Sequence, residues 1–286
     1  MTQLVPSKQM SSYENYTQTS AVYDHTRVPI GLEIITAALS SGSANPDQQI
    51  LLDAGCGTGI YAFALVDRVH RVEAIDLNRS MLSVARTKMR SAAEHGRIGF
   101  TLGSIAQLPL KTQSVNGVMI NQVLHHLPDQ AGHGWPLHHQ VLKECARVLQ
   151  PGGVLIINSC THEQLEKGFW FYELIPNART TVMRKIIPEK ELDALICGVG
   201  LTLSDRLVDL DSVLQGESYF DAEAVLDYAW RKGDSIWALA SNHELQTALT
   251  QVADLAAKNQ LQSFMQRYDA DRPALGQTSF SIAIKN

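Results

Sequence analysis

Apolar residues in the first 160 positions follow two alternating patterns. Short, mainly apolar runs are typical of strands covered on both faces, and they occur at 50–52, 72–77, 98–102, 115–121 and 154–158. Apolar residues with helical spacing occupy 60–69, 79–93 and 137–149, and an earlier helical period runs from Val28 to Leu39. This alternation predicts an α/β fold, a doubly wound parallel sheet with right-handed crossovers.

The pattern changes after Cys160. Residues 161–200 and 217–269 are expected to be mainly helical and rich in aromatic side chains, whereas 201–208 and 278–284 are expected to be strands. The second half is therefore not predicted to be a separate domain. It is predicted to be helical material inserted before and after one strand of the same sheet.

The composition of the chain argues against several classes of function. The 286-residue chain has 24 Lys and Arg against 29 Asp and Glu, a formal net charge of −5, and it lacks the basic cluster that nucleic-acid binding requires. The four cysteines form no CxxC pair, no apolar run is long enough to span a membrane, and the polar N-terminus lacks the apolar segment of a signal peptide. We expect a cytoplasmic protein, monomeric or homodimeric, that acts on a small molecule rather than on nucleic acid or at a membrane.

The strongest chemical signal is the run LLDAGCGTG at residues 51–59. An apolar strand ends in Asp53, and a turn with three glycines then opens a helix and allows a ligand close to the backbone. The glycines are Gly55, Gly57 and Gly59. One interpretation is the relaxed dinucleotide fingerprint GxGxxA starting at Gly57, which would hold a pyrophosphate. Because a carboxylate repels a pyrophosphate but attracts an ammonium, Asp53 favours a different ligand.

A second acid, Asp76, ends the next predicted strand about 20 residues beyond the glycines. A carboxylate at this position can hydrogen-bond both hydroxyls of a ribose. The alternative is a helix N-cap, because Asp76, Asn78 and Ser80 all precede a helix. Given the glycine turn before it, we interpret Asp76 as a ribose ligand.

Four ordered motifs resemble those of class I S-adenosylmethionine-dependent methyltransferases, in particular the group with the ubiquinone and menaquinone C-methyltransferases. They are DAGCGTG at 53–59, VEAIDLN at 72–78, GSIAQLPLKTQSVNGVMINQVLHHLP at 103–128 and RVLQPGGVLIINS at 147–159. The resemblance implies a Rossmann-like sheet of seven strands with the last one antiparallel. It also implies three parts: a cofactor-capping segment (1–25), a cofactor-binding core (26–160), and the remaining strands with an acceptor-binding helical cap inserted around the sixth strand (161–286).

The resemblance further implies which residues bind S-adenosylmethionine. Asp53 approaches the methionine ammonium, Asp76 binds the ribose hydroxyls, and Leu77 packs on the adenine. Ser104 stands where the family usually has an acid for the adenine amino group, so that contact is weaker or comes through the Ile105 backbone or Gln107. The complete predicted set is Asp53, Gly55, Cys56, Gly57, Gly59, Asp76, Leu77, Ser104, Ile105 and Asn121.

Candidate catalytic residues are His125 and His126, after the fourth strand, and Tyr23 in the capping segment. For the histidines the alternative is a hydrogen bond to loop backbone. Predicted acceptor-binding residues are Tyr16, Trp170, Tyr172, Arg179 and Tyr219, for which the alternative is packing within the cap or, for the arginine, a surface position. Six of the ten histidines lie between residues 125 and 162, but their spacing matches no ligand set, so no metal is expected.

The resulting hypothesis is a methyltransferase that transfers the sulfonium methyl group in line to a small-molecule acceptor. Since departure of a thioether is easy, the protein mainly positions the acceptor. Two alternatives remain: a regulatory protein that binds the cofactor without catalysis, and an NAD(P)-dependent oxidoreductase.

Overall fold

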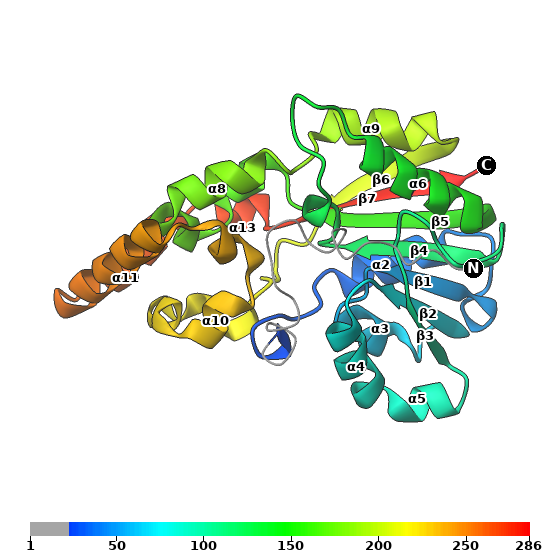
Figure 1. Ribbon diagram of the computed structural model, residues 1–286, viewed down its shortest axis with the longest axis horizontal. Helices are drawn as coiled ribbons and strands as arrows, with labels where there is room; N and C mark the ends of the chain where they lie inside the picture. The colour runs from blue at the N-terminus through cyan, green and yellow to red at the C-terminus, as the bar shows by residue number, and fades with distance from the viewer. Residues whose placement is uncertain (1–22) are drawn as a thin grey trace, which may run out of the picture.

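The computed structural model describes residues 23–286, and these form one seven-stranded sheet with a helical cap at one end (Figure 1). The strands are β1 Ile50–Ala54, β2 Arg71–Asp76, β3 Ile98–Leu102, β4 Val115–Asn121, β5 Leu149–Ser159, β6 Leu201–Val208 and β7 Ser279–Lys285. Their order is β3-β2-β1-β4-β5-β7-β6. The first five strands pair in parallel, and β7 is antiparallel to both β5 and β6. The predicted α/β sheet with an antiparallel last strand is confirmed.

Helices cover both faces of the sheet because neighbouring strand residues point to opposite sides. Leu51 belongs to one hydrophobic cluster and Leu52 to a second one. The first cluster is covered by α2 Leu32–Ser40, α3 Ile60–Leu65, α4 Arg79–Lys88 and α5 Arg90–Glu94, and the second by α6 Pro136–Val148 and α9 Glu189–Gly198. The carboxyl ends of the parallel strands are left free for a ligand, as in other open α/β sheets.

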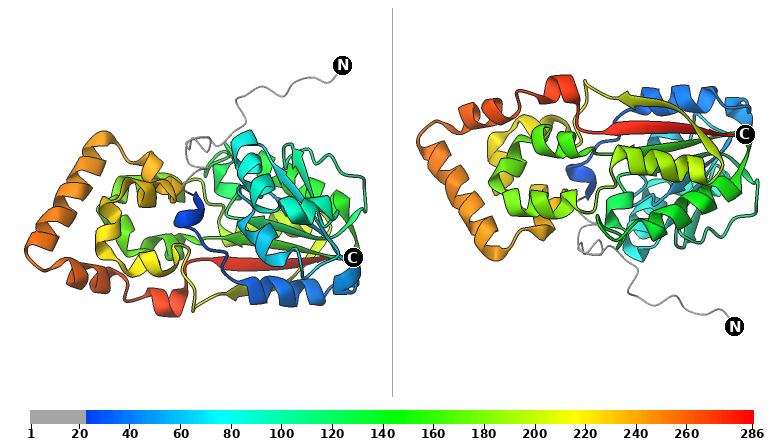
Figure 2. Two further views of the ribbon diagram at one scale, coloured as in Figure 1. Left: turned by 90° about the horizontal axis from the view of Figure 1, so that it is seen from below. Right: turned by 90° about the horizontal axis from the view of Figure 1, so that it is seen from above.

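The cap lies beyond these strand ends and forms the second lobe seen in Figure 2. One part of it connects β5 to α9, and the larger part connects β6 to β7. Its elements are α7 His162–Lys167, η5 Trp170–Leu174, α8 Pro176–Met183, η6 Gly216–Phe220, η7 Ala222–Leu226, α10 Tyr228–Lys232, η8 Ser235–Leu239, α11 Asn242–Ala257, α12 Leu261–Tyr268 and α13 Arg272–Leu275.

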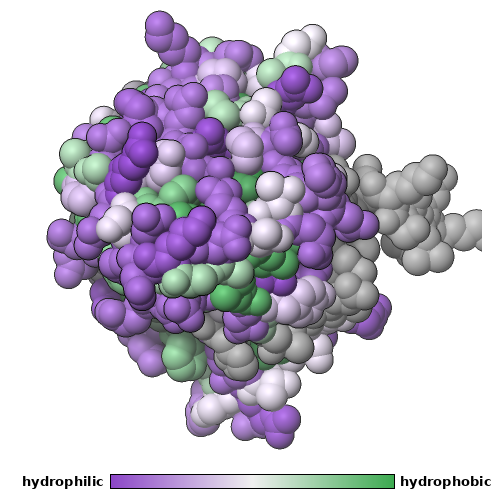
Figure 3. All heavy atoms as spheres, turned by 90° about the vertical axis from the view of Figure 1, so that its left-hand side faces the viewer, coloured by the Kyte–Doolittle hydropathy of each residue, from purple (hydrophilic) through white to green (hydrophobic). Residues whose placement is uncertain are grey.

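Aromatic packing holds the cap together. The Phe171 ring lies 4.7 Å from Tyr172, 5.0 Å from Trp230 and 6.2 Å from Trp237, measured between ring centroids. The outer end of the cap is mainly hydrophilic (Figure 3). The aromatic residues predicted from sequence therefore serve first as the core of this lobe.

Two predicted helices differ from the structure. The helix expected at 79–93 is broken at Met89, whose buried side chain packs under the glycine turn: a Cβ at Gly59 would lie 2.5 Å from Met89 Cε. Val28, expected to be helical, precedes Pro29 and donates its N–H to the Leu214 carbonyl at 3.0 Å. A proline disfavours a helical backbone at the residue before it, so Val28 lies outside the helix and α2 begins at Leu32.

The fifth strand is longer than predicted. It begins at Leu149, directly after α6, and Leu149 pairs with Val115 of β4. The run Pro151-Gly152-Gly153 therefore lies within the strand and does not end the helix. Within residues 23–286, no helix is both long and apolar enough to cross a membrane.

Candidate active site

The glycine turn after β1 brings backbone and a carboxylate to one point. Gly55 and Gly59 have φ values of +84° and +75°, and a Cβ at Gly55 would lie 2.7 Å from Val123 Cγ2. A side chain at either position would strain the backbone and meet a neighbouring side chain, Val123 at Gly55 and Met89 at Gly59. Asp53 precedes this turn and is only 2% exposed.

Asp76 is tied to the same turn from the neighbouring strand. Its Oδ2 accepts a hydrogen bond from the Gly57 N–H at 2.8 Å, and its Oδ1 accepts one from the Asn78 N–H at 2.7 Å. The helix-capping alternative belongs to Asn78, whose side chain accepts from the Ser80 and Met81 N–H groups. Asp76 is therefore not the cap of α4, and each of its oxygens keeps a lone pair for a ligand.

In the described part of the chain, one oxygen of the buried Asp53 carboxyl group has no partner. Its Oδ2 is buried without a hydrogen-bond partner, and burial, followed by the charge of Asp76, raises the pKa of Asp53 to about 8. The side-chain oxygen and nitrogen of Asn121, at the end of β4, are also buried without partners. Unmatched buried polar atoms destabilise a protein, so this cluster fits a ligand that supplies an ammonium donor.

A first cavity, which we call the nucleoside cavity, opens beside Asp76. Its walls come from the loops after β2, β3 and β4, and they include Leu77, Ser104, Ile105 and Asn121. Ser104 offers a neutral hydroxyl, and its Oγ accepts from the Ala106 N–H at 3.2 Å. These predicted cofactor residues are thus brought together along one wall.

A second cavity, the acceptor cavity, lies between the sheet and the cap. It contains about 850 Å³ of space including its mouth, and it shares Tyr23, Gly55, Asn121, Gln122 and His126 with the nucleoside cavity. Cys56 also lines it. A small molecule and a nucleoside can therefore meet at the ends of β1 and β4.

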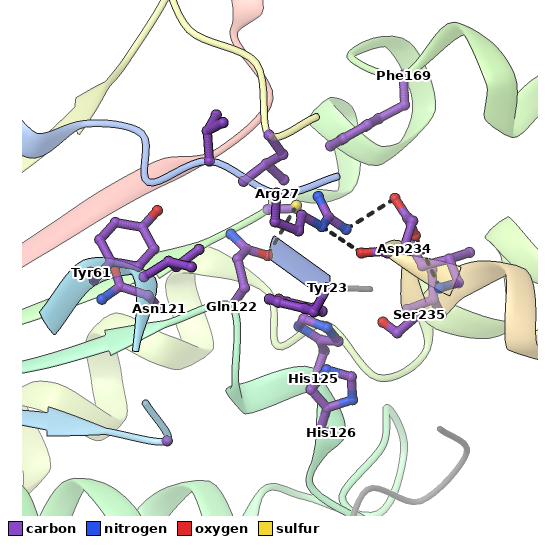
Figure 4. Close-up of a pocket in the computed structure, with 18 of the residues that line it drawn as sticks. Tyr23, Arg27, Tyr61, Asn121, Gln122, His125, His126, Phe169, Asp234 and Ser235 are labelled. Carbon is purple, nitrogen blue, oxygen red and sulfur yellow. Dashed lines mark hydrogen bonds and ion pairs between the residues drawn. The ribbon is translucent and has the colours of Figure 1, made fainter. Parts of the chain in front are cut away.

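The predicted histidines lie at this junction (Figure 4). His125 and His126 belong to the short turn η4 Leu124–His126, and their ring centroids are 4.1 Å apart. Burial, with a smaller contribution from Arg27, lowers the pKa of His125 to about 3, and burial also lowers the pKa of His126 well below its usual value. Both rings are neutral at neutral pH, so they accept hydrogen bonds but are weak bases.

Three predicted acceptor residues do not line the cavity. Trp170 is fully buried and donates its Nε1–H to the Tyr219 carbonyl at 3.1 Å, Tyr219 donates its hydroxyl to the Asp269 carboxylate, and Arg179 pairs with Glu173. The prediction that they contact the acceptor is corrected: their packing and pairing hold the cap together. Tyr172 does line the cavity, whereas Tyr16 lies outside the described residues.

Two residues that line the cavity, Gln122 and Asp234, were not predicted from the sequence. Gln122 has φ of +55°, a strained backbone for a residue with a side chain, and its amide donates to Asn158 Oδ1 at 3.1 Å. Asp234 lies in the cap and pairs with Arg27 across the cavity (Figure 4). No local motif identifies either residue, since both acquire their position from contacts distant in sequence. Among residues 23–286, no cluster of three or more His, Cys, Asp or Glu side chains is arranged to bind a metal.

The sequence similarity to known proteins lies mainly in the strands and helices of the sheet domain. Residues 52–157 match the family model described as methyltransferase domain. A probable S-adenosylmethionine-dependent methyltransferase of Mycolicibacterium smegmatis is 34% identical over 127 residues, which are 44% of this chain and 43% of that protein. The malonyl-[acyl-carrier protein] O-methyltransferase of Serratia marcescens is 36% identical over 129 residues, 45% of each chain. The chain thus spans less than half the length of these curated relatives.

The likeness of fold extends further. A putative methyltransferase from an antibiotic biosynthesis pathway of Anabaena variabilis has a TM-score of 0.67 at 21% identity, covering 92% of this chain and 100% of that chain. A doubly wound sheet with a glycine turn and an acid after each of its first two strands defines a Rossmann-like nucleoside-binding domain. Residues 52–157 are thus similar in sequence to a methyltransferase domain, and the described chain shares the fold of a methyltransferase.

Proposed function

We propose that this protein is an S-adenosylmethionine-dependent methyltransferase that acts on a small-molecule acceptor. The observation that carries the proposal is the buried Asp53 carboxyl group, one oxygen of which has no hydrogen-bond partner among residues 23–286. S-adenosylmethionine carries an ammonium for Asp53, a ribose for Asp76 and an adenine for the nucleoside cavity. These three groups follow one another along the cofactor in the same order as their partners in the protein. A dinucleotide would bring a pyrophosphate to Asp53, which that carboxylate disfavours.

In this proposal the cofactor residues divide among its parts. Asp53 binds the ammonium beside the backbone of Gly55, Gly57 and Gly59, with Cys56 and Asn121 alongside. Each oxygen of Asp76 already accepts one backbone donor and accepts one ribose hydroxyl as well. Leu77, Ser104 and Ile105 surround the adenine. When bound, the cofactor supplies an electrophilic methyl group on its sulfonium.

The chain's contribution to the reaction is placement of the acceptor and exclusion of water. Tyr23 lines both cavities, so it covers the point where the two ligands meet. The neutral imidazoles of His125 and His126 accept a hydrogen bond from the acceptor and orient its attacking atom. Positioning of this kind accounts for most of the rate enhancement when the leaving group departs easily.

We also propose the class of acceptor, the cellular compartment and the oligomeric state. The net charge of −5 favours a small acceptor over nucleic acid. The four cysteines are free, which is consistent with a reducing, cytoplasmic compartment. We propose a monomer or homodimer, and the division into a capping segment (1–25), a core (26–160) and a cap region (161–286) is part of the same proposal.

Calorimetric titration with S-adenosylhomocysteine, the product, tests the function. We expect micromolar affinity, at least about 100-fold weaker binding to the Asp76→Ala variant because two charge-assisted hydrogen bonds are lost, and no change for the exposed control Asp47→Ala. NADH should not bind. Wild-type protein that binds NADH but not S-adenosylhomocysteine would overturn the proposal in favour of an oxidoreductase.

A further inference from the structure

The acceptor cavity contains an ion pair that spans two distant parts of the chain. Arg27, just after η2 Tyr23–His25, places its Nη2 3.2 Å from Asp234 Oδ2, and the two side chains are 12% and 2% exposed. Arg27 Nε also donates to the Gly233 carbonyl at 2.6 Å. The pair is therefore fixed in one geometry and largely removed from water.

Asp234 is held from several directions. Its Oδ2 also accepts from the Tyr172 hydroxyl at 3.0 Å and from Gln215 Nε2 at 3.2 Å, and its Oδ1 accepts from the Ile236 N–H at 3.0 Å. A carboxylate with this many donors does not turn away to admit a competing anion. The negative charge is a permanent part of the cavity wall.

The charges of the described lining residues can be counted. Arg27 and Asp234 cancel each other on this wall, both histidines are neutral, and Asp53 ionises when the cofactor's ammonium arrives, so the described part of the wall carries one net negative charge in the cofactor complex. Lys185 acts on the histidines from a distance and does not line the cavity. S-adenosylmethionine carries an ammonium, a sulfonium and a carboxylate, one net positive charge. The wall of the acceptor cavity and the cofactor together are neutral before any acceptor enters, and Asp76 lies apart from this wall, in the nucleoside cavity.

A large part of the remaining wall is apolar. Its aliphatic and aromatic members come mostly from the cap, and they are Val28, Ile60, Leu165, Phe169, Val182, Ile186, Leu214 and Ile236. A charged acceptor would lose its hydration here without gaining a counterion, which disfavours its binding.

We propose that the acceptor is an uncharged, largely apolar molecule, and that Asp234 is the specificity-determining residue that excludes anionic acceptors by neutralising Arg27. This inference rests on the proposed function, because the cofactor's charge enters the balance. It also identifies the acceptor's reacting group as a hydroxyl, amine or carbon that is neutral when it binds.

Three probes with one ring system and different charges test the inference: 2-naphthol, 2-naphthoate and 2-naphthylmethylammonium. They are titrated calorimetrically into protein saturated with sinefungin, whose additional amine reproduces the positive charge of the sulfonium. We expect wild-type protein to bind 2-naphthol at least about tenfold more tightly than either ion, because each ion leaves an unbalanced buried charge. This ratio of affinities is measured on the wild-type protein alone.

The Asp234→Asn variant tests whether Asp234 is the residue that weakens the binding of the anion. The asparagine oxygen can still accept from the Ile236 N–H, and its NH2 group, at the Oδ2 position, can donate to the Tyr172 hydroxyl oxygen. The substitution frees the Arg27 charge, so 2-naphthoate affinity should rise about tenfold while 2-naphthol affinity changes less than about threefold. Asp227→Asn is the matched control: Asp227 also caps a short helix, accepting from the Ala229 N–H, but it is exposed and outside the cavity.

The outcomes separate the two proposals. If sinefungin does not bind, the proposed function fails and the inference fails with it. If sinefungin binds but 2-naphthoate binds as tightly as 2-naphthol, or 2-naphthol does not bind at millimolar concentration, the inference alone is overturned. An Asp234→Asn variant that binds sinefungin without gaining 2-naphthoate affinity would remove Asp234 from the account.

Discussion

The two halves of the site are built differently. The cofactor half is made of strand ends and tight turns, and its hydrogen bonds join Asp76 to the backbone of Gly57 and Asn78, 19 and 2 residues away. The acceptor half is made of side chains from the N-terminal segment and the cap, and the bond from Arg27 to Gly233 joins positions 206 residues apart. The first half depends on local backbone geometry, whereas the second depends on how separate segments pack.

This difference explains the charge arrangement. On the cofactor half, Asp53 is buried with an oxygen that has no partner, so that half is complete only with a ligand. On the acceptor half, Arg27 and Asp234 already satisfy each other. In the proposed function, the cofactor's ammonium pairs with the Asp53 carboxylate, whereas the acceptor meets the mutually neutralised Arg27–Asp234 pair.

Substitution of Asp53 should have the largest effect and should act in opposite directions on binding and stability. Asp53→Asn removes the ammonium partner, so S-adenosylhomocysteine affinity should fall about 10- to 100-fold in calorimetry. The same change removes a carboxylate that is costly to ionise in the free protein. We therefore expect the variant to be more stable without ligand.

The sign of the pH dependence follows from the raised pKa. Folding increases the pKa of Asp53 from 3.8 to about 8, so the folded state binds more protons than the unfolded state between these values, and its stability decreases as the pH rises. The gain from Asp53→Asn, measured by urea unfolding, should be about 2–4 kcal/mol larger at pH 8 than at pH 5. An identical gain at both pH values would contradict the assignment, and the exposed Asp67→Asn serves as control.

A smaller effect is expected where the N-terminal segment is attached to the cofactor half. Asp24 accepts from Thr58 Oγ1 at 2.5 Å and pairs with Lys88, so it joins η2 to the glycine turn and to α4. Asp24→Asn should weaken S-adenosylhomocysteine binding about 3- to 10-fold through the loosened contact of Tyr23, with little change in stability because the pair is partly exposed. Lys88→Met, which removes only the ion pair, should give a smaller loss. Unchanged affinity in both variants would show that this attachment does not support the cofactor.

The smallest effect on binding is expected in the interior of the cap. Tyr219→Phe removes the hydrogen bond to the Asp269 carboxylate without altering the cavity wall. Urea unfolding should show a loss of about 1–2 kcal/mol, while the affinities for sinefungin and 2-naphthol should stay within about twofold of wild type. A large loss of 2-naphthol affinity in a folded variant would return Tyr219 to the acceptor site.

The sequence predicted the two halves unequally for the same physical reason. Strand ends, Asp53, Asp76 and the glycine turn could be recognised because positive φ and buried strands impose residue types locally. Trp170 and Tyr172 are two residues apart in one aromatic run, yet only Tyr172 lines the cavity. Which of them faces the ligand is decided by packing against Asp234 and Tyr219, and single-sequence patterns do not contain that information.

The most direct test of the central claim is the proton balance of cofactor binding, measured by calorimetric titration of wild-type protein with S-adenosylhomocysteine at pH 6.5 in buffers with different ionisation enthalpies. In the free protein Asp53 is mostly protonated at this pH, because its pKa is about 8. An arriving ammonium ionises it, so binding should release close to one proton. Binding without proton release would contradict the contact between Asp53 and the methionine ammonium on which the account depends.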